Sequence, residues 1–86
     1  MNKKIIEKNE VLTIGELAEV SGTRLTTLKY YTELGILPFN QAEKRLTRKY
    51  KEKEALERLK EIKILKEKRL TIKEMIDYFN RSVKER

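Results

Sequence analysis

The sequence predicts a mainly α fold, a winged helix-turn-helix of four helices with a small β-hairpin wing. Two short amphipathic segments, joined by a few residues around a glycine, predict the helix-turn-helix. A proline and a polar stretch then interrupt the helical periodicity, and two longer helical patterns follow. The 86 residues contain no linker rich in glycine, serine or proline, so we expect one domain.

The first two helices are predicted by their ends as well as by their apolar faces. Thr13 and Glu16 form a capping-box pattern, and Gly22 stands where a helix usually ends. The apolar face of this helix comprises Ile14, Leu17, Ala18 and Val20. Gly35 closes the second helix, whose apolar residues Leu25, Leu28, Tyr31 and Leu34 recur every three positions.

The wing is expected at about residues 39–50, because Pro38 forbids a continuing helix and a polar turn-like stretch follows.

A third helix is expected to begin at about Lys51, with the apolar stripe Ala55, Leu56, Leu59, Ile62 and Leu65. Ile64 lies off that stripe, as an isolated exposed residue or part of a protein contact. A second capping box, Thr71 to Glu74, opens a fourth helix with the apolar residues Ile72, Met75, Ile76, Phe79 and Val83. We expect a flexible arm at 1–11, the domain at 12–80 and a short tail at 81–86.

Composition restricts the possible functions. The chain lacks cysteine and histidine, which excludes disulfides, thiolate or imidazole metal sites and the usual nucleophile–base pairs. With 21 Lys+Arg against 14 Asp+Glu, the net charge is +7, and residues 23–50 carry six basic and two acidic side chains. Such a balance favours a polyanionic partner, with nucleic acid ahead of a membrane surface. We expect a cytoplasmic, nucleoid-associated protein that is not an enzyme and uses no metal or cofactor.

The segments TIGELAEVSG and TLKYYTELGILP resemble the N-terminal winged-helix domain of the MerR family of bacterial transcription regulators. The family pattern continues with "Y-R-x-Y", "L-x-R-L-x-x-I" and "G-F-S-L-x-E-I", matched here by Arg48 and Tyr50, by Leu56 to Ile62, and by Leu70 to Met75. Four positions depart from the pattern. Thr26 replaces the first arginine of "R-T-L-R-Y-Y" while Arg24 stands where a capping serine is usual, Thr47 replaces a tyrosine, and Arg69 replaces a glycine. The family's C-terminal dimerisation helix and sensor region are not expected in this chain.

The resemblance implies double-stranded DNA as the partner, with a recognition helix at about 24–34 in the major groove and the wing on the backbone or in the minor groove. Of the adjacent tyrosines, Tyr31 is expected in the core and Tyr30 at a phosphate, although the family lets both approach the backbone. Thr23 or Thr26 is expected to cap the helix in place of the missing serine. Arg48 is the foremost expected phosphate contact. The candidate DNA-binding residues are Thr13, Arg24, Thr26, Thr27, Lys29, Tyr30, Tyr31, Lys44, Arg45, Arg48, Lys49, Tyr50 and Arg58.

The leading hypothesis is therefore sequence-specific DNA binding by a MerR-like transcriptional regulator, monomeric when free and a dimer or array on DNA. One alternative is a small architectural protein, like phage excisionases or plasmid partition proteins, that fills tandem sites. Another is a protein-interaction module whose lysines are an ordinary solvated surface.

Overall fold

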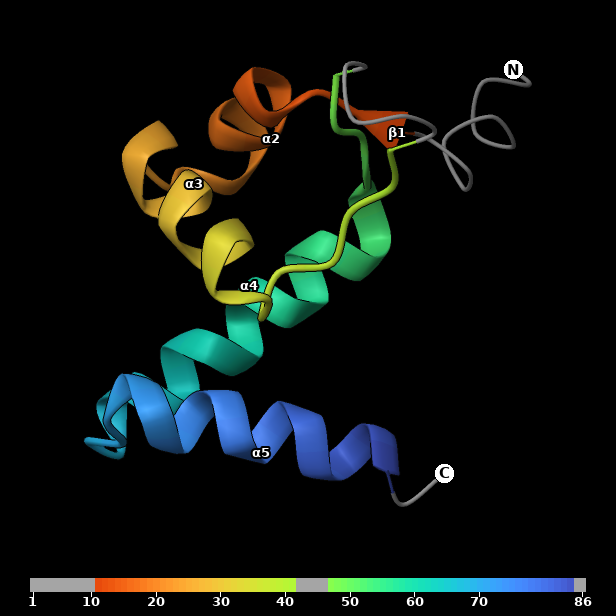
Figure 1. Ribbon diagram of the computed structural model, residues 1–86. Coiled ribbons are helices and arrows are strands. Elements are labelled where there is room, and N and C mark those ends of the chain that lie inside the picture. The colour runs from red at the N-terminus through yellow and green to blue at the C-terminus, as the bar shows by residue number, and fades with distance from the viewer. Residues whose placement is uncertain (1–10, 42–46, 85–86) are drawn as a thin grey trace.

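The computed structural model describes residues 11–41 and 47–84. The elements in chain order are β1 (Val11–Leu12), α2 (Ile14–Ser21), α3 (Leu25–Leu34), β2 (Tyr50–Lys51), α4 (Glu52–Glu67) and α5 (Ile72–Lys84). Figure 1 shows α4 crossing the middle of the molecule, with α2, α3 and the strands on one side of it and α5 on the other. The expected mainly α fold with four helices and a small antiparallel β structure is confirmed.

The helix α2 begins at the predicted capping box, and both helices of the helix-turn-helix end at the predicted glycines. The Thr13 hydroxyl accepts a hydrogen bond from the Glu16 amide at 3.2 Å, and the Thr13 amide donates to the Glu16 carboxylate at 2.9 Å. Gly22 ends α2 with φ +72°, and Gly35 ends α3 with φ +84°. Glycine has no Cβ to oppose this left-handed conformation, so the chain turns sharply at both points.

The strand that pairs with β2 comes from the segment preceding α2. Val11 pairs with Lys51 and Leu12 with Tyr50 in antiparallel register. Val11, which was expected in the flexible arm at 1–11, therefore belongs to the sheet instead. An isolated bridge between Asn40 and Lys49 closes the base of the wing, with N–O distances of 2.7 and 2.8 Å. Residues 1–10 and the wing residues 42–46 lie outside the described ranges.

The connection between α4 and α5 has the left-handed turn implied by the family's glycine. Arg69 occupies it with φ +67°, and the amide of Leu70 donates to the Leu65 carbonyl at 3.1 Å. Thr71 and Glu74 then form the predicted second capping box, with bonds of 2.8 and 3.1 Å. The helix α5 reaches Lys84, so it runs through part of the segment expected as a tail.

One hydrophobic core joins all these elements. Its buried members are Leu12, Leu17, Leu28, Tyr31, Ile36, Leu37, Tyr50, Ala55, Ile62, Leu65, Met75 and Phe79. Two residues expected in the core are exposed instead, namely Val20 at 52% and Leu25 at 41%. Val20 occupies the last turn of α2 beside an open cavity, and Leu25 is the first residue of α3, so neither is covered by a neighbouring element. The Val83 side chain lies outside the described set.

Candidate nucleic-acid interface

The helix α3 presents an exposed polar strip on the side opposite its buried face. Leu28, Tyr31 and Thr32 are buried against the core. The exposed residues of α3 and its N-cap are Arg24, Leu25, Thr26, Lys29, Tyr30 and Glu33. Four of the residues predicted to contact DNA, namely Arg24, Thr26, Lys29 and Tyr30, are thus brought together on one accessible surface.

The beginning of α3 lacks a side-chain cap among the described residues. Arg24 occupies the N-cap position with extended backbone angles and makes no capping hydrogen bond. The prediction that Thr23 or Thr26 supplies the cap is wrong, because neither side chain caps the helix; the Thr23 amide instead donates to the Ser21 hydroxyl at 3.1 Å. Uncapped amides at a helix N-terminus attract anions, since they are unpaired donors at the positive end of the helix dipole.

The wing contributes Arg48, whose guanidinium is held beside α3. Its Nη1 atom lies 3.2 Å from Glu33 Oε2, and its Cζ atom lies 4.9 Å from the centre of the Phe39 ring. Both charged side chains remain partly exposed, at 36% and 68%, so the pair contributes at most about 1 kcal/mol. Sequence reasoning missed Glu33, although an acidic residue on the predicted DNA-facing side of an otherwise basic segment could have signalled it. Lys49 is exposed nearby, whereas Lys44 and Arg45 lie outside the described residues.

Tyr50, which was predicted to contact DNA, is a core residue and offers no surface to DNA. Its side chain is fully buried, and its hydroxyl lies 2.9 Å from Thr32 Oγ1. Thr32 donates its only hydroxyl proton to the Leu28 carbonyl at 2.8 Å. Tyr50 must therefore donate to Thr32, and this bond fixes the base of the wing to the buried side of α3.

Tyr30 and Tyr31 divide as predicted between surface and core. Tyr30 is 50% exposed on the strip, whereas Tyr31 is 6% exposed. The Tyr31 hydroxyl accepts a long hydrogen bond of 3.5 Å from Lys66 Nζ on α4. Thr27 lies one turn before Tyr31 on this same side of α3, half-buried beside α4, so neither residue is part of the exposed strip.

The Arg58 side chain, predicted to contact DNA, is 27% exposed and makes contacts within the protein. Its Nη1 atom donates to the Ile36 carbonyl at 2.7 Å, and its guanidinium lies 4.1 Å above the Phe79 ring. Glu61 Oε1 is 4.0 Å from its Nε atom. Arg58 therefore joins α4 to the segment after α3 and to α5. Thr13, another predicted DNA contact, uses its hydroxyl to cap α2 by accepting the hydrogen bond from the Glu16 amide.

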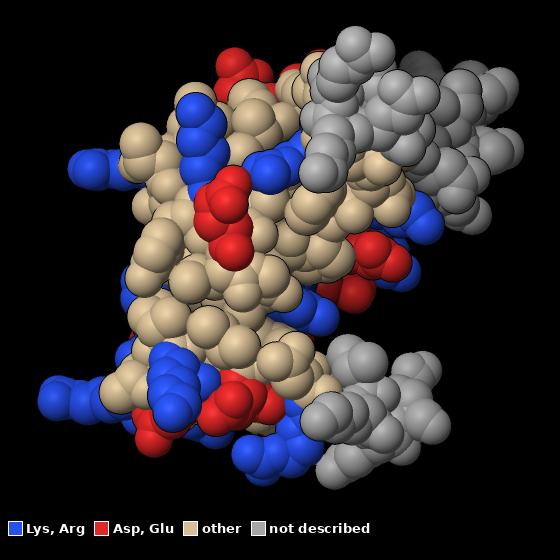
Figure 2. Space-filling view, in the orientation of Figure 1, with Lys and Arg blue, Asp and Glu red and all other residues tan. Residues whose placement is uncertain are grey.

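The surface charge is distributed unevenly. Figure 2 shows basic and acidic side chains together at both the upper end of the molecule and the lower end, where α5 lies, with a largely uncharged surface at mid-height on the left and centre of the view. Within the described residues, no group of three or more carboxylate, histidine or cysteine side chains could hold a metal ion. None of the helices in those ranges has the length and apolarity needed to cross a membrane.

A family model described as MerR HTH family regulatory protein matches residues 12–82, a range that begins in β1 and extends into α5. No curated protein and no solved structure matches the chain.

Proposed function

Because the chain belongs to the MerR family of helix-turn-helix regulatory proteins, which bind DNA, we propose that it reads a specific double-stranded sequence with α3 in the major groove. The observation that carries this proposal is the exposed strip of Arg24, Thr26, Lys29 and Tyr30 on α3. In a helix-turn-helix the residues near the start of the second helix reach the base edges. Arg24 and Thr26 occupy that position.

Each side chain of the strip has a chemistry suited to one part of the duplex. The Arg24 guanidinium can donate two hydrogen bonds to guanine, and Thr26 can hydrogen-bond a base or contact a thymine methyl group. Lys29 can neutralise a phosphate, and the exposed Tyr30 hydroxyl can donate to a phosphate oxygen. The uncapped amides of α3 add further donors for the backbone.

The wing supplies contacts that do not depend on sequence. Arg48 lies next to the exposed side of α3, and Lys49, the following residue, is exposed and positively charged. The exposed pair between Arg48 and Glu33 is weak, so a phosphate can replace Glu33 as the partner of the guanidinium at small cost. A single copy makes few contacts, and a second copy on the same duplex would raise the affinity.

The proposal is tested by the effect of single substitutions on two duplexes, one selected by the protein and one scrambled. We expect Arg48→Ala to weaken binding to both duplexes by a similar factor, because it removes a phosphate contact. Arg24→Ala and Thr26→Ala should weaken binding mainly to the selected duplex. Lys73→Ala on α5 is the matched control for loss of one exposed positive charge. Equal weakening of both duplexes by all three test variants would contradict direct reading of bases by α3.

A further inference from the structure

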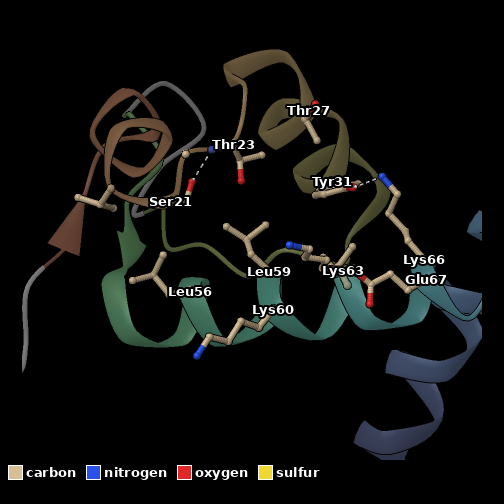
Figure 3. A pocket seen from close by; sticks show the side chains of 13 residues that line it. Ser21, Thr23, Thr27, Tyr31, Leu56, Leu59, Lys60, Lys63, Lys66 and Glu67 are labelled. Atoms are coloured by element: carbon tan, nitrogen blue, oxygen red, sulfur yellow. Dashed lines mark hydrogen bonds between the residues drawn. The ribbon is translucent and has the colours of Figure 1, made fainter.

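A cavity of about 820 Å³ lies between the helix-turn-helix and α4 (Figure 3). One wall consists of the last turn of α2, the turn after it, and the side of α3 that carries Thr27 and Tyr31. The other wall is the face of α4 from Leu56 to Glu67. This volume falls within the range of about 300–1,000 Å³ that is typical of sites for small ligands.

One end of the cavity is apolar. Figure 3 shows the side chains of Leu56 and Leu59 pointing from α4 toward α2 and α3. Val20 lines the same cavity and is 52% exposed, although its position on the apolar face of α2 predicted burial. This end therefore offers aliphatic surface that the protein itself leaves uncovered, and an apolar group placed there would remove it from water.

The other end is cationic. Lys66 lines it and donates to the Tyr31 hydroxyl, and Figure 3 shows the Lys63 ammonium extending from α4 into the space between Tyr31 and Leu59. Within residues 11–41 and 47–84, neither lysine is within ion-pair distance of a carboxylate, although Glu67 lines the same end. Lys60, the third lysine of the lining, points away from α3 in Figure 3.

We propose that this cavity binds an amphipathic organic anion, with its carboxylate or sulfonate between Lys63 and Lys66 and its apolar body over Leu56, Leu59 and Val20. The order of groups along α4 favours this class of ligand. Leu56 and Lys66 are ten residues apart on the helix, which corresponds to about 15 Å, a span suited to an extended chain with one charged end. A small inorganic anion would leave the apolar end empty, and a neutral molecule would leave the lysines without a counter-charge.

The site is tested with decanoate and its neutral counterpart decanol, titrated into the protein in the absence of DNA. Backbone amide signals in ¹H–¹⁵N spectra report where each probe binds. We expect decanoate to cause saturable shifts both near Leu56 and Leu59 and near Lys63 and Lys66, and decanol to bind more weakly.

Charge reversal at the cationic end supplies the decisive comparison. Lys63→Glu should weaken decanoate binding by about tenfold or more, because it replaces an attraction with a repulsion. Lys53→Glu is the matched control, since Lys53 is an exposed lysine on the same helix outside the cavity. Unfolding midpoints of both variants establish that they are folded.

Three outcomes would overturn the proposal. One is the absence of saturable shifts, and a second is equal weakening by Lys63→Glu and Lys53→Glu, which indicates attraction by net charge alone. The third is a set of shifts confined to the lysines, which indicates binding of a simple anion without the apolar end. Because the titration contains no DNA, its failure leaves the proposed reading of DNA by α3 unaffected.

Discussion

Replacing Thr32 by valine tests the buried hydrogen bond that joins α3 to β2. Tyr50 donates to Thr32 at 2.9 Å, and Thr32 in turn donates to the Leu28 carbonyl at 2.8 Å. Valine matches the shape of threonine but offers no acceptor. In the variant, the Tyr50 hydroxyl is left as an unpaired donor on a side chain that is fully buried.

The direction of these bonds predicts an asymmetry between the two partners. Thr32→Val leaves the buried Tyr50 hydroxyl without an acceptor and should lower the unfolding free energy by about 2 kcal/mol. Tyr50→Phe should cost only about 1 kcal/mol, because Thr32 keeps its bond to Leu28 and loses one donor to its oxygen. The double variant should be no less stable than Thr32→Val, since removal of the phenol hydroxyl also removes the unpaired group.

Thermal and urea unfolding of the four proteins completes this double-mutant cycle. For a domain of this size, 1 kcal/mol corresponds to roughly 4–8 °C in Tm, so Thr32→Val should lower Tm by roughly 10 °C. The reasoning is refuted if Tyr50→Phe costs as much as Thr32→Val, or if the two losses add in the double variant. Either result would mean that the bond does not have the assigned direction or is not shielded from water.

Three further substitutions test other parts of the account. Arg58→Ala should lower the unfolding free energy by about 2 kcal/mol, because it removes the bond to Ile36 and the contact with Phe79, and should leave DNA sequence preference unchanged; a changed preference in the folded variant would return Arg58 to the interface. Arg24→Ser should raise stability in urea unfolding by about 1 kcal/mol by capping α3, while an anisotropy titration should show weaker DNA binding; unchanged DNA affinity would show that neither the guanidinium nor the free amides contribute. Arg69→Gly should raise stability by about 1 kcal/mol, because its φ of +67° is strained for a residue with a Cβ; a lower Tm would contradict that strain.

Local patterns predicted the four helices, the starts of α2 and α5 and the ends of α2 and α3. Each capping box spans four residues, and a glycine at a helix end acts through its own backbone, so both signals are complete within a short stretch. The periodic spacing of Leu28 and Tyr31 similarly identified the buried side of α3. The exposed strip followed from it, because the remaining face of the helix must meet solvent.

Tertiary partners decided what the sequence could not predict. The pairing of β1 with β2 joins positions about forty residues apart, and two-residue strands are too short to show an alternating pattern. Arg58 was assigned to DNA by its basic charge and family position, yet its inward turn depends on a carbonyl at Ile36 and a ring at Phe79. Val20 was assigned to the core by its place on α2, but it is 52% exposed and lines the cavity.

Selection of bound duplexes from a random pool at near-physiological salt tests the central claim, that the exposed strip of α3 reads a DNA sequence. We expect an enriched motif whose preferred bases change when Thr26→Ala is used in the same selection. An inverted or direct repeat in the motif would also give the arrangement of two copies. Retention of DNA without enrichment would contradict sequence reading and favour an architectural role, and no retention by the folded protein would contradict DNA binding altogether.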